Sequence, residues 1–542
     1  MKGKNTQSGG SSNQEKKIKK VEWGVLSLLL ALVMAAAAFI GGWFGRWSAL
    51  GANKQALLNA IDTAKDKYYK EIDEDAFYEQ LFAAFEFDRY SAFYSKKDYE
   101  QITAEREGQN RDAGFSLLGG DSFLMIYDVL DGSSAEEAGL EEGMYFYQFG
   151  KTEDTLKSGS AEDYFAFVST LKAEEEYVVR CGESDDIAEA QLYPVTNGEK
   201  GAGIALTRKY DPMRVYQVIG NSPADHAGLK RGMYILQYGA SEADLRAGTS
   251  SEFTSFVQNE LEPDKDGNVT FYLQVSFDKE PEQLPEPVKI TMQDYQASYC
   301  FYRDSEVGYH FWLSDKEMKP DSTNEEPIEA LDDKTAYIAL SQFTGNAAKE
   351  FKEFLGIMKE RGRTNLILDL RGNGGGYMDV FVEIASCLLK ETTSGAQKVA
   401  YAQFRDGATV SYSVRSSAYD KYFTARSRVS ILADEYTASA SECLIGALVD
   451  YGTVAFADIY LRENAQGVAR TYGKGIMQTY YDVSGGNMLK LTAAEIFWPR
   501  SGKTIHDVGV TTTDGAKAIK STLLPDASDA FLQRAIELIQ KA

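Results

Sequence analysis

The segment TASASECLIGAL, residues 437–448, combines a candidate nucleophile with a predicted turn from a strand into a helix. The apolar run at 431–433 predicts a buried strand, and the small residues that follow predict a sharp turn. A serine at such a turn lies at a helix N-terminus, where backbone N–H groups lack intrahelical partners and can stabilise an oxyanion. Ser439 is therefore a candidate nucleophile.

A serine nucleophile needs a base, and none of the three histidines of the chain lies in a recognisable triad motif. Lys474, between Gly473 and Gly475, is the next candidate. Flanking glycines allow close packing, so the amine can enter a low-dielectric site where it loses its proton. A Ser-Lys dyad needs no histidine. Taken singly, each half has an ordinary explanation, because such serines often cap helices and most lysines are solvated.

A third stretch, NLILDLRGNGGG at residues 365–376, predicts a buried strand that runs into a glycine loop and then a helix. A loop of this kind can present bare N–H groups to an anion. It lacks the Gly-Lys-Ser/Thr of a Walker motif, so the sequence does not predict nucleotide binding.

Together, the three stretches resemble the carboxyl-terminal processing (tail-specific) serine proteases. The resemblance implies that Ser439 is the nucleophile and Lys474 the base, with Thr437 in place of the family's first serine. It also implies that Gln478 orients the lysine. The other implied residues are the oxyanion donors Ala440 and either Gly375 or Gly376, and the supporting residues Asp369, Arg371, Glu442 and Asp450.

The sequence departs from this family in the spacing of the dyad. Ser439 and Lys474 are 35 positions apart (474 minus 439), roughly ten more than the resemblance leads us to expect. The excess falls in residues 458–470, which are polar. We expect this segment to be a loop that bulges outward without moving the dyad.

Composition narrows the class of protein. A chain of 542 residues with 44% hydrophobic content can hold several domains with real cores. The net charge is −24, and residues 1–20 carry +5 from six lysines and one glutamate, so residues 21–542 carry −29. This acidity disfavours nucleic acid as a partner. The widely spaced cysteines lack a metal-ligand pattern, so we expect small buried hydrophobes, no metal site and no cofactor. They are Cys181, Cys300, Cys387 and Cys443.

The N-terminal region predicts a membrane anchor at residues 21–47. Its apolar run from Trp23 to Phe44 is 22 residues long, enough to span a bilayer. The lysine-rich residues 1–20 predict a cytoplasmic tail, which places the rest of the chain outside a single-pass cell-membrane anchor. The alternative is a signal peptide cleaved near Ala35 to Ala38.

After a predicted helical segment at 48–111, the chain contains an internal repeat. AEEAGLEEGMY at 135–145 recurs 89 residues later as ADHAGLKRGMY, which indicates duplicated domains. Both copies resemble PDZ domains, at 112–197 and 198–290, in which a peptide tail adds a strand to the sheet edge. We expect the second carboxylate loop at 201–204. The first is predicted at Gly114, Phe115, Ser116 and Leu117. Whether the second copy recognises peptides or is a rigid spacer stays open.

Residues 291–334 predict strands and a linker, and residues 335–542 predict the protease core. The fold class is an α/β protease core, a mixed β-sheet with packed helices, with two PDZ-like β/α domains, an N-terminal helical segment and one transmembrane helix. The predicted strands are 335–340, 365–370, 428–433, 476–482 and 487–497, the last two a hairpin turning at Gly485-Gly486. The predicted helices are 345–361, 377–389, 439–450 and 527–541.

The leading functional prediction is a membrane-anchored Ser-Lys endopeptidase. It would cut extracytoplasmic proteins near apolar C-termini that a PDZ domain recognises. The alternative is a catalytically silent PDZ scaffold for envelope proteins. The substrate, the oligomeric state and the need for a regulatory protein partner stay open.

Overall fold

The structure is a computed structural model in which two compact units are distinguished, residues 1–85 and 86–542. In the first unit, the structure describes helix α2 (Ala52–Lys67). The predicted anchor at 21–47 lies outside the described residues. Among those that are described, no helix is both long enough and apolar enough to cross a bilayer. The described residues are 52–67, 81, 88–113, 115–118, 122–130, 132–183, 187, 190–197, 204–210, 212–313, 318–321, 326–390, 397–483, 485–525 and 527–541.

The core of the second unit is an eight-stranded sheet in the order β16-β15-β14-β17-β18-β21-β22-β25. The strands from β17 to β25 are parallel, whereas β14 to β16 are added antiparallel. Residues 291–334 therefore contribute strands to the core sheet itself. The bounds are β14 (Cys300–Arg303), β15 (Gly308–Leu313), β16 (Met318–Asp321), β17 (Thr335–Leu340), β18 (Asn365–Asp369), β21 (Val429–Ala433), β22 (Ile459–Glu463) and β25 (Lys517–Lys520).

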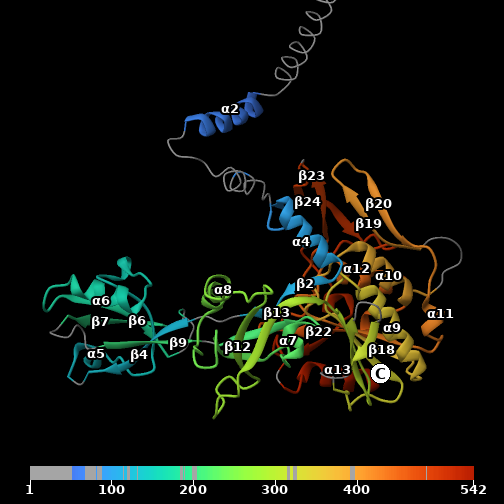
Figure 1. Cartoon of the computed structure of the whole chain (residues 1–542). Helices are drawn as coiled ribbons and strands as arrows, with labels where there is room; N and C mark the ends of the chain where they lie inside the picture. The colour runs from blue at the N-terminus through green and yellow to red at the C-terminus, as the bar shows by residue number, and fades with distance from the viewer. Residues whose placement is uncertain are drawn as a thin grey trace, which may run out of the picture. The chain divides into compact units, whose positions relative to one another are not determined.

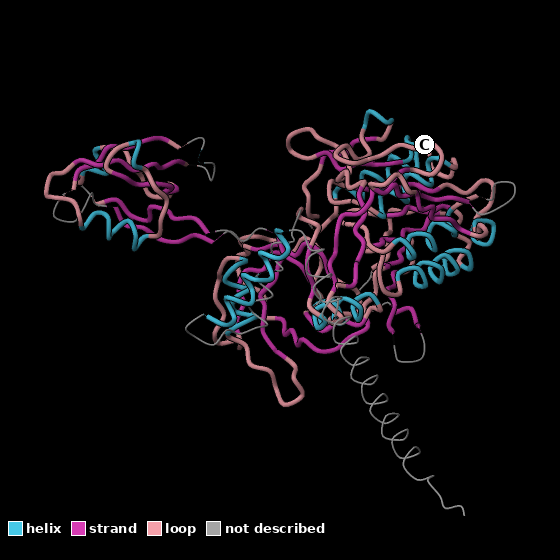
Figure 2. Tube along the Cα trace, turned by 90° about the horizontal axis from the view of Figure 1, so that it is seen from above, coloured by secondary structure: helices cyan, strands magenta, loops and turns pink. Residues whose placement is uncertain are grey.

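Helices cover both faces of this sheet (Figures 1 and 2). Successive strand residues point to opposite faces, so Ile338 packs in one cluster with α9, α10 and α12 while its neighbour Tyr337 packs against α13. Each buried Leu or Ile stabilises the fold by about 1.5–3 kcal/mol.

The predicted strand and helix series of this region is confirmed within about three residues at each end. The helices are α9 (Ala347–Glu360), α10 (Met378–Leu388), α11 (Tyr419–Tyr422), α12 (Ala440–Asp450) and α13 (Ala530–Lys541).

Strand β22 corrects part of the prediction of an outward loop at 458–470. Its first four residues are buried, and it lies between β21 and β25 in the parallel sheet. The charged Arg462 made the segment look polar. Its guanidinium is neutralised by an ion pair with Glu435 and donates to the carbonyl of Ser521 at 2.9 Å. The first part of the segment is thus a strand of the core, whereas residues 464–470 form the predicted loop, in which 465–468 are exposed.

A second, five-stranded sheet carries the lysine region, in the order β1-β24-β19-β20 with β23 paired to β24. The hairpin between β23 and β24 turns at Gly485 and Gly486, which have φ of 67° and 85°. Strands β23 and β24 pair antiparallel up to Asp482 and Met488, and the Val483 amide donates to the Asn487 carbonyl at 3.1 Å, so the predicted hairpin is confirmed. The bounds are β1 (Ala92–Tyr94), β19 (Gln397–Phe404), β20 (Thr409–Val414), β23 (Ile476–Asp482) and β24 (Met488–Phe497). Helix α4 (Lys96–Arg106) follows β1.

The repeat forms two further sheets. The first-repeat sheet has the order β7-β6-β5-β4-β9, and the second-repeat sheet has the order β2-β13-β12-β11-β10-β3. Their helices are α5 (Ser134–Glu137), α6 (Ala161–Ser169), α7 (Pro223–His226) and α8 (Ser250–Asn259). The strands are β2 (Gln109–Asp112), β3 (Phe115–Leu118), β4 (Ser122–Val129), β5 (Tyr145–Gly150), β6 (Glu176–Gly182), β7 (Gln191–Thr196), β9 (Ile204–Tyr210), β10 (Met213–Val218), β11 (Tyr234–Gly239), β12 (Val269–Ser276) and β13 (Val288–Gln296).

The two sheets do not follow the predicted boundaries 112–197 and 198–290. Strand β3 pairs with β10 in the second-repeat sheet, and β9 pairs with β4 in the first-repeat sheet. The first-repeat sheet is thus built from residues 122–210 and is inserted within the second, whose strands come from residues 109–118 and 213–296. Because the repeats have similar edge strands, alternation alone did not show which sheet each strand joins.

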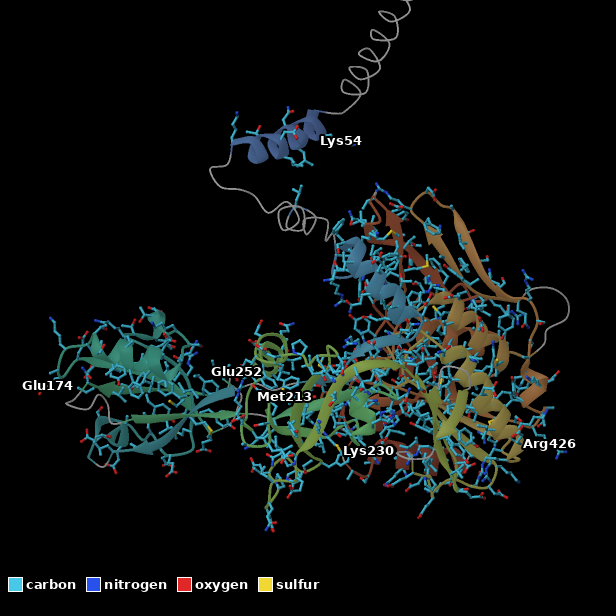
Figure 3. All side chains as sticks on the ribbon, viewed as in Figure 1. Lys54, Glu174, Met213, Lys230, Glu252 and Arg426 are labelled. Carbon is cyan, nitrogen blue, oxygen red and sulfur yellow. The ribbon has the colours of Figure 1, made fainter. Side chains whose placement is uncertain are left out.

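Many charged side chains outside the site lie on the surface of the described elements. Lys54, Glu174 and Arg426 point away from the ribbon (Figure 3), and all three are exposed. This is the usual solvent-facing arrangement of long charged side chains.

Candidate functional site

Ser439 lies at the turn between β21 and α12, as predicted. Its φ of 57° and ψ of −115° are unusual for a residue with a side chain and indicate local backbone strain. The turn is held on both sides: the amide of Ala438 donates to the Asn373 carbonyl at 2.9 Å, and the amide of Cys443 donates to the Ser439 carbonyl at 2.9 Å. Burial raises the pKa of the Cys443 thiol to about 12, so this cysteine stays a neutral core residue.

The glycine loop after β18 lies directly against this turn. Gly375 has φ of 101°, and a Cβ there would stand 2.7 Å from the Cβ of Ser439, so only glycine fits. The amide of Gly375 donates to the Asn373 side chain at 2.9 Å. Within the part of the chain that the structure describes, no hydrogen bond engages the amides of Gly376 and Ala440.

Asn373 is a functional candidate that the sequence reasoning missed. Its side chain is fully buried and donates to the carbonyl of Leu340 at 2.7 Å. Its carbonyl accepts from the Ser441 hydroxyl at 3.0 Å as well as from the Ala438 amide. One residue therefore ties the glycine loop to strand β17 and to the turn at residues 437–441, here called the nucleophile turn. Its position inside the loop was the available signal.

Glu442 joins the nucleophile turn to residues 471–475 around Lys474, here called the lysine segment. Its carboxylate is fully buried and accepts from the amides of Ser439, Gly473 and Lys474 at 2.9, 2.8 and 3.0 Å. It also accepts from the Thr471 hydroxyl at 2.5 Å. Burial raises the pKa of Glu442, and these hydrogen bonds oppose the shift. The supporting role predicted for Glu442 thus has a definite geometry.

Lys474 is half-buried at the start of the lysine segment. Burial lowers its pKa, and the nearby charges of Lys490 and Arg89 lower it further. This is the direction that a general base requires. Its Nζ lies 4.5 Å from the ring centre of Tyr90. Among the described contacts there is no hydrogen bond between this amine and the Ser439 hydroxyl.

Two residues implied by the resemblance make other contacts in the described structure. The Gln478 side chain donates to Thr492 Oγ1 at 3.1 Å and makes no described hydrogen bond with Lys474. Asp450 accepts from the amides of Arg500 and Ser501 at 2.8 and 2.9 Å. Because Asp450 ends an 11-residue helix that starts beside Ser439, it lies about 15 Å along the axis from the nucleophile.

Asp369 and Arg371 brace the start of the glycine loop. Arg371 pairs with Asp369 at 2.6 Å and with Asp529 at 2.9 Å, and the Tyr337 hydroxyl donates to Asp369 at 2.7 Å. Although burial opposes it, the two carboxylates raise the pKa of Arg371. The predicted supporting pair is therefore an ion-pair network that joins the loop to the C-terminal segment before α13.

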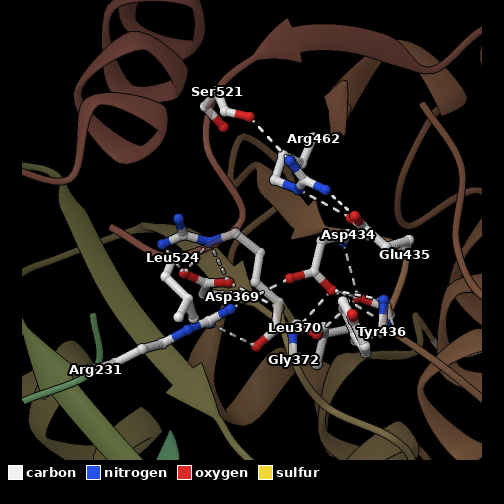
Figure 4. A network of polar contacts seen from close by, with 12 residues as sticks. Arg231, Asp369, Leu370, Gly372, Asp434, Glu435, Tyr436, Arg462, Ser521 and Leu524 are labelled. Carbon is white, nitrogen blue, oxygen red and sulfur yellow. Dashed lines mark hydrogen bonds and ion pairs between the residues drawn. The ribbon is translucent and has the colours of Figure 1, made fainter. Parts of the chain in front are cut away.

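A neighbouring network, which sequence reasoning missed, includes a residue of the second repeat (Figure 4). Asp434 is fully buried and accepts from the Gly372 amide at 2.9 Å. It pairs with Arg231 at 3.4 Å, and Arg231 also donates to the Arg371 carbonyl at 3.3 Å. An acidic residue directly after a buried strand was a usable signal for Asp434. Nothing in the sequence indicated that Arg231 would reach it.

The predicted peptide-binding residues lie beside the second repeat rather than the first. Gly114 is outside the described residues, and Phe115, Ser116 and Leu117 belong to β3, the outermost strand of the second-repeat sheet. A groove of about 420 Å³ lies between the chain just before β3 and helix α8. It is lined by Asp112, Ala113, Ser250, Phe253, Thr254, Val257, Gln258, Phe271 and Met292.

Ser439 is thus a strained serine at the carboxyl edge of a parallel sheet, on a strand-to-helix turn. In one class of α/β sites, the nucleophile lies on a turn of this kind. Within this domain, residues 334–514 match the model of Peptidase family S41.

Two curated relatives are each similar over about a third of the chain. The carboxyl-terminal-processing protease of Synechocystis sp. is 31% identical over 205 residues, which are 38% of this chain and 43% of that protein. The carboxyl-terminal-processing protease of Picosynechococcus sp. is 32% identical over 167 residues, 31% of this chain and 36% of that protein. The matched segment thus spans less than half the length of either relative.

Among solved structures, the photosystem II D1 C-terminal processing protease matches with 16% identity and a TM-score of 0.37, covering 83% of each chain. A TM-score below 0.5 is too low to establish a common overall fold. The similarity to known proteins therefore rests on the family match and the two curated relatives.

Proposed function

We propose that the chain is a serine endopeptidase of the carboxyl-terminal processing type, with Ser439 as nucleophile and Lys474 as base. The observation that supports this best is the buried Glu442 carboxylate, which holds the backbones of both residues through hydrogen bonds. A scaffold gives no chemical reason to join a strained serine to a lysine of lowered pKa.

In the proposed reaction, the neutral Lys474 amine takes the proton of the Ser439 hydroxyl as its oxygen attacks the scissile carbonyl. The amides of Ala440 and Gly376 hold the resulting oxyanion, because the amide of Gly375 is already engaged. The protonated lysine then gives its proton to the leaving amine, and water hydrolyses the acyl-enzyme by the same route. The described contacts hold no hydrogen bond between the Lys474 amine, which lies over Tyr90, and the Ser439 hydroxyl, so the two groups must come together before the first step.

The direct test uses the full chain in mild detergent with an unfolded protein substrate. Ser439→Ala and Lys474→Ala should each abolish cleavage, and the double variant should be no worse than either single, because nucleophile and base act as one unit. Lys398→Ala is a matched control, since Lys398 also stacks over a tyrosine ring, 4.4 Å from the centre of Tyr401. Substantial turnover by Lys474→Ala would exclude the dyad.

The pH profile tests the role of the lysine. Only the neutral amine accepts a proton, so kcat/KM should rise with pH along a limb set by Lys474. Burial places this limb below the value of about 10.4 of an exposed lysine. A profile that stays flat from acid to mildly alkaline pH contradicts the assignment.

The second candidate is a catalytically silent scaffold. One observation favours it: the amine of Lys474 lies over Tyr90 and is not hydrogen-bonded to Ser439 in the described structure. Reaction with an active-site fluorophosphonate separates the two functions. Labelling of Ser439 that is lost in Lys474→Ala supports the enzyme, whereas an unlabelled serine over the whole pH range supports the scaffold.

Substrate tails are proposed to bind at the second repeat. Edge strand β3 offers backbone groups for strand addition, and the groove beside α8 offers apolar burial for the last side chain. Thr254 lines this groove and is exposed, so Thr254→Arg should block it without unfolding the helix. The neighbouring Ser255→Arg is the matched control, because Ser255 is exposed but does not line the groove.

Binding of a fluorescent peptide with an apolar C-terminus is the measurement. Amidation of its terminal carboxylate should weaken binding, since it removes the charge that loop N–H groups would hold. Equal affinity for the free and amidated peptides contradicts tail recognition.

Membrane anchoring remains part of the proposal. It rests on the apolar run from Trp23 to Phe44 and the preceding lysines. Full-length protein should stay in the membrane fraction after alkaline carbonate washing and should keep its N-terminal lysines. A new N-terminus between roughly residues 36 and 47 would show a cleaved signal peptide instead.

A further inference from the structure

Residues 88–94, here called the arm, cover the lysine segment although they are far from it in sequence. The arm is fixed by β1, whose Ala92 pairs with Lys490 of β24. The Lys490 amine also donates to the Tyr94 hydroxyl at 2.9 Å. At the other end, the Asp88 carboxylate accepts from the amides of Tyr90 and Ser91 at 2.8 and 2.7 Å. The resulting turn presents Tyr90 in one orientation.

The Tyr90 ring faces the candidate base. Its centre lies 4.5 Å from Lys474 Nζ, and its hydroxyl lies 3.1 Å from that of Tyr472. An aromatic face within about 6 Å attracts an ammonium group but has little attraction for a neutral amine. The contact therefore distinguishes the two protonation states of Lys474.

Charged groups from three elements surround the same amine. The positive Arg89 of the arm and Lys490 of β24 disfavour the ammonium, whereas Asp88 of the arm and Glu442 of α12 favour it. The ring of Tyr90, over which the Arg89 guanidinium also lies at 4.9 Å, favours the ammonium without adding negative charge. Among the contacts of the described residues, Lys474 at this position has no hydrogen bond to Ser439.

We propose that Tyr90 is a positioning residue of this site, whose ring docks the protonated Lys474 amine away from Ser439 and releases the amine when its proton is lost. The inference rests on the proposed role of Lys474 as base. The arm would then control the pH at which Lys474 becomes available as a base. Removal of the aromatic face should destabilise the ammonium, so the pKa of Lys474 and the acid limb of activity should both move to lower pH.

The test compares Tyr90→Leu with Tyr90→Phe, which keeps the ring but loses the hydroxyl contact with Tyr472. Tyr90→Met is a second variant without a ring if the leucine variant does not fold. Two readouts are taken on the full chain: the pH dependence of kcat/KM, and the pH dependence of Lys474 acetylation by acetic anhydride, quantified by mass spectrometry in a Ser439→Ala background. Acetylation reports the proton equilibrium of the amine without requiring cleavage.

Tyr90→Leu should lower the pKa from acetylation and the acid limb by about 0.5 pH unit, a threefold change in the proton equilibrium. Tyr90→Phe should leave both close to those of the unmodified chain. An unchanged or raised pKa in Tyr90→Leu overturns the inference, because the arm would then act only by excluding water. If the unmodified chain does not cleave, the proposed function fails, but the acetylation result still decides the role of Tyr90.

Discussion

Replacement of Glu442 by glutamine should damage stability and activity together. The carboxylate accepts four hydrogen bonds, three from backbone amides and one from the Thr471 hydroxyl. A glutamine offers one carbonyl oxygen that can accept two of them, and its NH2 group turns toward the other donors. Two hydrogen bonds to a charged group are lost, at about 1.5–3 kcal/mol each.

Part of this loss is offset because the glutamine variant no longer buries a charge. We therefore expect the free energy of unfolding to fall by about 2–4 kcal/mol, which leaves most domains folded at 25 °C. The effect on kcat/KM should be larger, about 100-fold, because the turn at Ser439 and the backbone at Lys474 lose their common anchor.

The assay measures urea unfolding and kcat/KM on the same preparations. Glu383→Gln is the matched control, since Glu383 is an exposed carboxylate on α10 that pairs with Lys352, and such a surface pair contributes about 0–1 kcal/mol. If Glu442→Gln unfolds and cleaves like the control variant, Glu442 does not hold the dyad and the reasoning fails.

Two further predictions concern carboxylates that make no contact with Ser439 or Lys474 in the described structure. Burial raises the pKa of Glu350 to about 7 from an ordinary 4.5, so its contribution to stability is complete below pH 4.5 and is lost as the pH rises through 7. In thermal unfolding, Glu350→Gln should gain stability relative to the unmodified chain as the pH rises from 4.5 to 7. The gain should reach about 3 kcal/mol, the equivalent of 2.5 pKa units. A stability difference that stays constant with pH would contradict this prediction. Asp450→Asn should lower the free energy of unfolding by about 1–2 kcal/mol through its turn contacts but keep kcat/KM within about threefold, whereas a 100-fold loss of cleavage would return Asp450 to the site.

The sequence predicted the core elements well because their signals are local. Strand β17 coincides with the predicted 335–340, and β23 with 476–482, since short apolar or β-branched runs bounded by turns need no distant information. The turn at Ser439 and the glycine loop were predictable for the same reason. Both are marked by small residues at places where the chain must bend sharply.

Contacts between distant segments could not be predicted in this way. Strand β22 looked polar because the partner that neutralises Arg462 is Glu435, on another segment. The exchange of β3 and β9 between the repeat sheets depends on pairing between residues 75–103 positions apart, for which alternation gives no preference. Tyr90 and Arg231 reach the site from outside the matched family segment, so their roles become visible only in the folded chain.

The sequence departs from the pattern of the resembled family at Thr437 and in the spacing between Ser439 and Lys474, and the contacts at each place show the effect on the site. Thr437 stands where the resemblance expects serine, and its hydroxyl donates to the Leu370 carbonyl at 2.8 Å and accepts from the Asp434 amide at 2.9 Å. A serine hydroxyl could make the same two bonds, so the change conserves the link between the nucleophile turn and the glycine loop. The added length before Lys474 is accommodated as strand β22, packed beside β21, and an exposed turn at 464–468. Because a parallel strand is fixed by its neighbours on both sides, this addition does not displace the turn at the end of β21. Neither departure therefore removes a contact of Ser439 or Lys474, and neither argues against the dyad.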